Sequence, residues 1–176
     1  MKKTGFVHVY AGDGKGKTTA AAGLAVRAAG RGMRVVFAQF MKGRESGEAV
    51  EFNKIPEIEV LRADKDYGFY RNMTDEEKLL QKKAHDKITE RIFERVYKLK
   101  DVDMVVLDEL AWAYRYGLID KTGITELLKN HEGVEIVITG RNPSEELLEA
   151  ADYITEMKKV KHPYESGVAA REGIEY

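Results

Sequence analysis

The sequence of 176 residues contains no cysteine, which excludes disulfide bonds, thiolate catalysis and cysteine metal sites. It also lacks any apolar run close to the ~18 residues of a membrane-spanning helix, so we expect no membrane partner. No long apolar segment follows Met1 as it would in a signal peptide. We therefore expect a cytoplasmic protein.

The chain also lacks a charge excess of either sign. Its net charge is −1, so the electrostatic footprint of a nucleic-acid-binding protein is missing and no nucleic-acid partner is expected. Hydrophobic residues make up 43% and charged residues 34%, a balance that excludes a disordered chain. The length favours one domain, residues 1–176, with a sizeable core.

The most informative stretch is 11–19, AGDGKGKTT, which lies between an apolar run at 6–10 and an alanine-rich run at 20–29. Strand, glycine-rich turn and helix in this order are the context of a phosphate-binding loop. Gly12, Gly14 and Gly16 allow backbone conformations that other residues rarely adopt. Successive N–H groups can then point inward and bind an anion at the positive end of the helix. We predict that Lys17 reaches the terminal phosphates and that the Thr18 hydroxyl binds Mg²⁺. A glycine turn that merely caps a helix is the alternative.

Apolar runs and helical periodicity alternate along the rest of the chain. Strands are predicted at 5–10, 33–40, 58–63, 104–107, 134–139 and 153–157. Helices are predicted at 17–29, 48–53, 74–100, 110–116, 122–130 and 142–151. This alternation predicts an α/β fold with a mostly parallel sheet and helices on both faces.

Two of the predicted helices carry further detail. Thr74 and Glu77 form a capping-box pattern at the start of the long helix. Asn142 is predicted to cap the last helix, with Pro143 at its first position. The face of the long helix that we expect to be buried consists of Leu80, Ala84, Ile88, Ile92, Val96 and Leu99.

Two acids, Asp108 and Glu109, follow the buried strand at 104–107. Ligands of open α/β sheets gather at the carboxyl ends of the strands, and the phosphate loop lies at that same edge. A carboxylate there can hold Mg²⁺ directly or through water. An acid at this position can equally cap the next helix. We expect one of the two acids to bind Mg²⁺ and the other to cap the helix.

Other polar residues reach the same edge of the sheet. Arg141 follows the strand at 134–139 and can bind a phosphate, with a simple turn as the alternative. Gln39 and Lys42 follow the strand at 33–40, where a solvated loop is the alternative.

The four histidines form no catalytic or metal-binding pattern. His8 lies within the first strand and is expected to be a satisfied core or edge residue. His85 and His131 are expected on helix or turn surfaces, and His162 lies in a loop beside Lys161.

Together these motifs resemble those of the P-loop type of cob(I)alamin (corrinoid) adenosyltransferase, over nearly the whole chain. The matching segments are GDGKGKTTAA at 12–21, QFMKG at 39–43, VLDEL at 106–110, ITGR at 138–141, TEM at 155–157, VKHPY at 160–164 and GIEY at 173–176.

The resemblance implies a RecA-like P-loop fold with three layers and a homodimer. It implies transfer of the 5′-deoxyadenosyl group of ATP to Co(I) of a corrinoid, with release of triphosphate, in adenosylcobalamin biosynthesis or salvage. A flavoprotein or another reductase is the expected source of Co(I). ATP would be bound by Gly12, Asp13, Gly14, Lys15, Gly16, Lys17, Thr18 and Thr19.

The resemblance also implies roles for single residues. Thr18 and Glu109 would bind Mg²⁺, with Asp108 as a further candidate, and Lys17, Phe69 and Arg141 would act in catalysis. Phe69, Tyr70, Lys161 and His162 are the candidate corrinoid-binding residues.

Phe69 belongs to the stretch Gly68–Arg71, which is similar to a Gly-Phe-x-Trp stretch that crowds the lower face of the corrin in many members. Arg71 stands in place of that tryptophan. We predict that Phe69 displaces the lower axial ligand of cobalt. The alternative is that the rings of Phe69 and Tyr70 merely pack the loop onto the domain.

Two other classes of protein share the phosphate loop. A P-loop kinase or ATPase would transfer the γ-phosphoryl group, and the pair of acids suits that reaction equally well. The sequence shows no lid of arginines and no obvious acceptor site for it. A nucleotide-binding switch is the third class, and no base-specificity motif supports it.

Overall fold

The centre of the molecule is a parallel β-sheet. The computed structural model describes residues 4–42, 46–65, 67–68 and 70–175, and within them six strands pair in the order β3-β2-β4-β5-β1-β6. Every neighbouring pair in this order is parallel. The strands are β1 (Val7–Ala11), β2 (Val35–Gln39), β3 (Ile58–Arg62), β4 (Met104–Asp108), β5 (Glu135–Thr139) and β6 (Tyr153–Glu156). The predicted α/β fold is confirmed.

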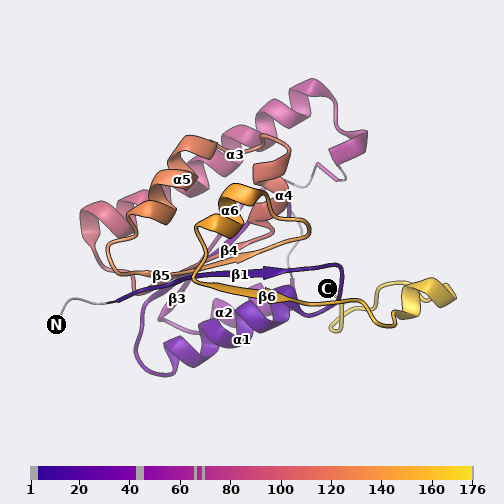
Figure 1. Cartoon of the computed structure of the whole chain (residues 1–176), viewed down its shortest axis with the longest axis horizontal. Helices are drawn as coiled ribbons and strands as arrows, with labels where there is room; N and C mark the ends of the chain where they lie inside the picture. Colours follow the sequence, from indigo (N-terminus) through magenta and orange to yellow (C-terminus); the bar gives the residue numbers. More distant parts are fainter. Residues whose placement is uncertain (1–3, 43–45, 66, 69, 176) are drawn as a thin grey trace.

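Helices cover both faces of the sheet, with α1 and α2 on one face and α3 to α6 on the other (Figure 1). The helices are α1 (Lys17–Ala29), α2 (Gly47–Phe52), α3 (Asp75–Phe93), α4 (Leu110–Arg115), α5 (Lys121–Lys129) and α6 (Glu145–Glu149). Short helical segments follow at η1 (Tyr70–Asn72), η2 (Glu94–Leu99) and η3 (Pro163–Ser166). The predicted bounds of α1 are confirmed at both ends.

Burial explains why the central strands are continuous apolar runs. All five residues of β2 and of β4 are buried, because helices pack on both sides of them. Alternate side chains of these strands enter two separate cores: Phe37 and Val106 pack against α1, whereas Val36 and Leu107 pack on the α3–α6 side. The three-layer arrangement that was predicted therefore follows from side-chain alternation.

The predicted start of the last helix was wrong. Ser144, in an extended conformation, is the residue that precedes α6, and Pro143 lies outside the helix. Asn142 adopts a left-handed conformation with φ of 48°, so it belongs to the turn after β5. Asparagine favours such turns as much as it favours helix caps, and the sequence pattern does not separate the two.

The predicted buried face of the long helix, which the structure divides into α3 and η2, was wrong at its two ends. Leu80 is 39% exposed and Leu99 is 52% exposed, whereas Gln81 and His85 are buried. The predicted capping box of Thr74 and Glu77 is present. The buried face of the helix differs from the one that the apolar pattern predicts. Gln81 and His85, rather than leucines, face the loop after β2.

His85 is fully buried, so its predicted surface position was wrong. Its Nδ1–H donates to the carbonyl of Leu118 at 2.8 Å. Its Nε2 accepts from the Gln81 amide at 2.6 Å and from the backbone N–H of Met41 at 3.2 Å. Since both ring nitrogens are thus used by the neutral form, His85 fixes the chain that follows β2.

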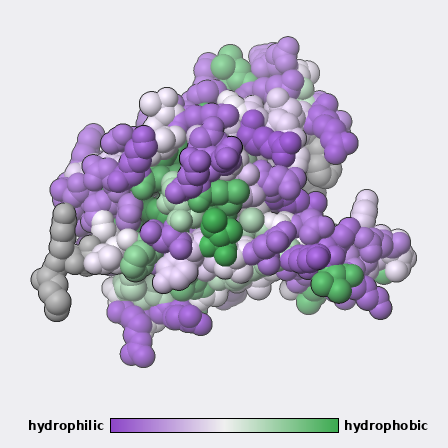
Figure 2. Space-filling model, viewed as in Figure 1, coloured by the Kyte–Doolittle hydropathy of each residue, from purple (hydrophilic) through white to green (hydrophobic). Residues whose placement is uncertain are grey.

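The C-terminal arm, residues 157–175, projects beyond the carboxyl end of the sheet (Figure 1). Its surface is mainly hydrophilic, with a hydrophobic spot on the face shown (Figure 2). Val160 is 90% exposed and Ile174 55% exposed. No helix among the described residues is long and apolar enough to cross a membrane.

Burial lowers the pKa of His85 from 6.5 to about 4, so the neutral ring contributes stability above pH 6.5 that is lost as the pH falls toward 4. We predict that the unfolding free energy drops between pH 7 and pH 4.5 by about 2 kcal/mol more in the parent protein than in His85→Gln. Urea denaturation across this range measures the difference. His131→Gln is the control, and parallel pH profiles for the parent and His85→Gln would contradict the prediction.

Candidate active site

The phosphate loop connects β1 to α1 as predicted. Gly12 and Gly16 have φ of 103° and 118°, values that residues with a Cβ rarely adopt. Gly14 is needed for a different reason: its N–H donates to the carbonyl oxygen of Met157 at 2.6 Å, and a Cβ there would lie 2.5 Å from that oxygen. The C-terminal arm therefore begins in direct contact with the loop.

Lys17 is the buried cation of this loop, with 7% of its surface exposed. Its ammonium donates to the carbonyl of Gly14 at 2.8 Å, which folds the side chain back over the loop. Burial lowers the pKa of Lys17, and the nearby charge of Glu109 opposes that shift. A buried, preoriented ammonium beside loop N–H groups is suited to an anionic phosphate.

Asp108 ends β4 and joins the phosphate loop to the other strand ends. It is fully buried, and its Oδ1 accepts from the hydroxyls of Thr18 at 2.8 Å and Thr139 at 2.7 Å. Its Oδ2 accepts from the ammonium of Lys42 at 2.9 Å. Burial lowers the pKa of Lys42, but the charge and the hydrogen bond of Asp108, together with the charges of Glu48 and Glu109, outweigh that effect, so the pKa is raised. Three partners, from the start of α1, the end of β5 and the loop after β2, thus stabilise one buried carboxylate.

Glu109 adopts a left-handed backbone with φ of 60° at the start of α4. Its N–H donates to the hydroxyl of Thr139 at 2.9 Å, which holds this unfavourable conformation. Burial, followed by the negative charge of Asp108, raises the pKa of the Glu109 carboxyl, although Lys17 and Arg141 act in the opposite direction. Strain in a non-glycine residue beside a phosphate loop is typical of a functional position.

Arg141 is exposed at the end of β5, close enough for its charge to lower the pKa of Lys17 and of Asp13. The Asp13 carboxylate accepts from the backbone N–H of Lys159 at 3.0 Å. The structure therefore brings Arg141 to the phosphate loop, as its predicted role requires.

Gln39 and Lys42 do not lie in a solvated loop, so that alternative was wrong. Gln39 is fully buried, and its amide donates to Ser46 at 3.2 Å and to Glu48 at 3.4 Å. Lys42 is half-buried, and its ammonium forms an ion pair with Asp108. His85 bonds the backbone N–H of Met41, the residue before Lys42, which has a left-handed conformation with φ of 59°.

Among the candidate corrinoid-binding residues, Phe69 lies outside the described residues. Tyr70 begins η1, and its ring packs on Tyr116 with 4.3 Å between centroids. Tyr116 in turn stacks on Trp112 of α4, so three aromatic rings pack in a row. Tyr70 therefore takes part in packing, which was the alternative foreseen for it, while remaining partly exposed.

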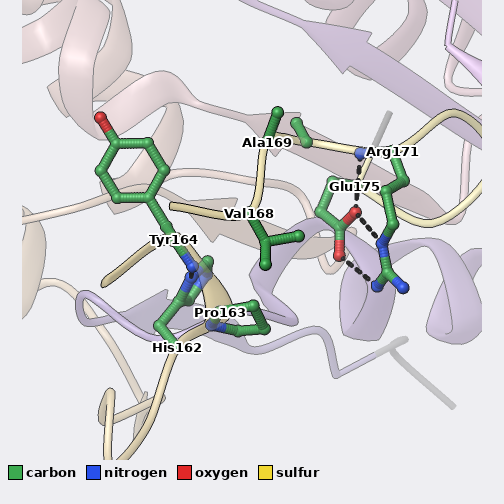
Figure 3. Close-up of a pocket in the computed structure, with 8 residues that line it drawn as sticks. His162, Pro163, Tyr164, Val168, Ala169, Arg171 and Glu175 are labelled. Atoms are coloured by element: carbon green, nitrogen blue, oxygen red, sulfur yellow. Dashed lines mark hydrogen bonds and ion pairs between the residues drawn. The ribbon is translucent and has the colours of Figure 1, made fainter. Parts of the chain in front are cut away.

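Lys161 and His162 lie in the C-terminal arm, away from Tyr70 in the sequence. Lys161 is exposed, and Nδ1 of His162 accepts from the backbone N–H of Tyr164 at 3.2 Å. Figure 3 shows His162 with Tyr164 and Val168 around a small hollow of about 70 Å³, which the Arg171–Glu175 ion pair closes on one side. Within the described part of the chain, no hydrogen bond or ion pair joins Lys161 or His162 to η1.

Oxygen donors suited to Mg²⁺ meet at the carboxyl end of β4: the Thr18 hydroxyl and the carboxylates of Asp108 and Glu109. The described residues contain no group of three histidine or acidic side chains that could hold a metal by themselves. This donor set fits a Mg²⁺–nucleotide complex, in which phosphates supply several of the ligands and the protein supplies one or two.

Sequence reasoning gave no role to two contributors to this site. Thr139 ends the predicted strand at 134–139, and in the structure it bonds both Asp108 and Glu109. A threonine that ends a buried strand was the available signal. The role of the Met157 carbonyl could not be predicted from the sequence. It bonds the backbone N–H of Gly14, 143 positions away, and a backbone contact of this kind does not depend on the side chain of Met157.

We predict that Thr139→Val lowers the unfolding free energy by about 1–3 kcal/mol, because it removes partners from a buried carboxylate and from a buried N–H. Urea denaturation measures this loss. Thr122→Val, at an exposed position on α5, is the matched control. Equal stability of the two variants would show that the Thr139 hydroxyl does not support this network.

A fold similar to this one occurs in the KaiC-like protein PH0186 from Pyrococcus horikoshii. Its crystal structure matches with a TM-score of 0.54 and 17% sequence identity, over 88% of this chain and 73% of that chain. The likeness concerns the fold alone.

Comparison with curated sequences gives closer relatives. Corrinoid adenosyltransferases are 34% identical in Pseudomonas aeruginosa (98% of this chain, 84% of that protein) and 33% identical in Escherichia coli strain K12 (98% and 86%). Corrinoid adenosyltransferase CobA of Salmonella typhimurium is 33% identical over 100% of this chain and 88% of that protein. Residues 3–176 match the family model described as ATP:corrinoid adenosyltransferase BtuR/CobO/CobP. This chain belongs to that family.

Proposed function

We propose that this protein transfers the 5′-deoxyadenosyl group of ATP to Co(I) of a corrinoid and releases triphosphate, in adenosylcobalamin biosynthesis or salvage. Membership of the ATP:corrinoid adenosyltransferase family supports the proposal. The observation that carries it in the structure is a phosphate loop that holds the buried Lys17 and whose Thr18 bonds Asp108 at the end of β4, next to Glu109.

The reaction is a displacement at the 5′ carbon of ATP. Cobalt of the corrinoid substrate donates an electron pair to that carbon, the Co–C bond forms, and the C–O bond to the triphosphate breaks with its electrons on oxygen. Since Co(I) is itself a strong nucleophile, the protein needs neither a nucleophilic side chain nor a general base. Its tasks are to orient carbon against cobalt and to stabilise charge on the leaving triphosphate.

The phosphate loop suits the second task. The loop N–H groups of residues 12–19 and the Lys17 ammonium would contact the triphosphate, with Arg141 as a further cation at the same edge. Thr18, Asp108 and Glu109 would hold Mg²⁺, which when bound neutralises part of the phosphate charge. The buried bonds of Asp108 orient the Thr18 hydroxyl toward this position.

On the corrinoid side the residue assignments stay predictions from the sequence. Phe69 would displace the lower axial ligand, with Tyr70 beside it, and Lys161 and His162 would contact the corrinoid from the C-terminal arm. The arm begins at Met157, against the phosphate loop, and that contact supports a role near the bound ATP. A homodimer, a reductase partner and a cytoplasmic location also stay predictions.

Phosphoryl transfer by a P-loop kinase or ATPase is the competing function. The phosphate loop and the acids suit it, but the family match favours adenosyl transfer. Anaerobic incubation with ATP and a chemically reduced corrinoid tests the proposal, because alkylation of Co(I) changes its absorbance spectrum. An unchanged Co(I) spectrum with an intact, folded protein would overturn it.

We predict that Lys17→Ala lowers the turnover of Co(I) corrinoid at least 100-fold, because it removes a buried positive charge from the leaving triphosphate. The rate is measured with chemically supplied Co(I), and circular dichroism checks the fold. Lys98→Ala, at an exposed position remote from the loop, is the control. Near-parental turnover by a folded Lys17→Ala protein would remove the loop from the mechanism.

The two acids should respond differently to neutralisation. The Asp108 carboxylate already bonds Thr18, Thr139 and Lys42, whereas no hydrogen bond engages the Glu109 carboxylate among the described residues. We predict that Glu109→Gln raises the Mg²⁺ concentration needed for half-maximal rate more than Asp108→Asn does. Titration of Mg²⁺ against rate decides this, and the reverse order would mean that Asp108 is the principal ligand.

A further inference from the structure

A groove of about 490 Å³ lies between the edge strand β3 and helix α3, next to the segment that leads to η1. Its floor is apolar and includes Leu61, Leu80 and Ile88, and Tyr67 lines one side. The groove explains why Leu80 is 39% exposed on a helix face that the sequence pattern places in the core. A groove of this volume suits part of a small-molecule ligand better than it suits the surface of a partner protein.

The rim of the groove is positively charged. Lys83 and Lys87 stand one helical turn apart on α3. Lys65 also lines the groove, from the segment after β3, and its ammonium lies over the ring of Tyr67 at 4.8 Å from the centroid. Within the described residues neither Lys83 nor Lys87 forms an ion pair or a hydrogen bond. Arg91 differs, because it pairs with Glu59 at 3.2 Å and with Glu94. Asp64 is the one acid that lines the groove among the described residues.

The groove lies at a distance from the phosphate loop that leaves room for a second substrate. In the sheet, β3 is separated from β1 by β2, β4 and β5, which corresponds to four strand spacings, or about 19 Å. ATP on the phosphate loop would lie toward the β1 end of that span, and β4 lies at its middle. The corrinoid would then lie toward the β3 end, next to the groove.

We propose that this groove binds the nucleotide tail of a complete corrinoid, with the phosphodiester on Lys83 and Lys87 and the flat base on the apolar floor beside Tyr67. This inference rests on the proposed function. The tail combines one negative charge with a planar aromatic base, and the groove combines unpaired cations with an apolar floor. When the base leaves cobalt, the tail hangs from the lower face of the corrin and needs a site of its own.

The test compares two corrinoids that differ only in the tail: cobalamin, which carries it, and cobinamide, which lacks it. Both are supplied as chemically reduced Co(I), and KM is measured for the parent, for Lys83→Gln/Lys87→Gln and for Lys82→Gln/Lys98→Gln. The last variant removes the same charge outside the groove and is the matched control. Circular dichroism confirms that each variant is folded.

We expect the groove variant to raise the KM ratio of cobalamin to cobinamide roughly three- to tenfold, as two exposed cations facing one phosphate allow, and the control variant to leave that ratio unchanged. An equal change of KM for both corrinoids, or no change, would overturn the inference.

The same variants are also assayed with a protein reductant as the source of Co(I). A loss confined to that assay would overturn the inference and would assign the groove to an acidic protein partner. Failure of the parent protein with both corrinoids would instead contradict the proposed function.

Discussion

The buried carboxylate of Asp108 is the interaction on which the site depends. An unpaired charge at this depth would strongly destabilise the fold. The groups that donate hydrogen bonds to this carboxylate must therefore keep their positions, as side chains of the core do. Those partners come from the start of α1, the end of β5 and the loop after β2. One electrostatic requirement thereby aligns three strand ends and the phosphate loop.

A second layer of contacts supports this arrangement from both sides. The neutral ring of His85 fixes Met41, the residue before Lys42, while the carbonyl of Met157 fixes Gly14 within the loop. Both contacts use the backbone, so they constrain direction without adding charge near the phosphates. Met41 and Glu109, which lie next to Lys42 and Asp108 in the chain, both adopt left-handed backbone conformations.

Much of the fold could be predicted from the sequence because local signals and burial agree there. The apolar runs of β2 and β4 and the glycine-bounded α1 are examples. The phosphate loop and the acids of β4 were predictable because their chemistry depends on residue type and spacing. The partners of Asp108 were not, because they meet only when the sheet forms. His85 was misplaced because hydrophobic periodicity treats a satisfied, buried histidine as a surface residue.

The central claim is that ATP is attacked at its 5′ carbon and not at its γ-phosphorus. Anaerobic turnover of ATP labelled with ¹³C at the 5′ position, followed by NMR and by analysis of the phosphate products, tests it most directly. The account predicts a ¹³C label bonded to cobalt and an equal amount of inorganic triphosphate. ADP with phosphate or a phosphorylated product, and no labelled carbon on cobalt, would contradict it.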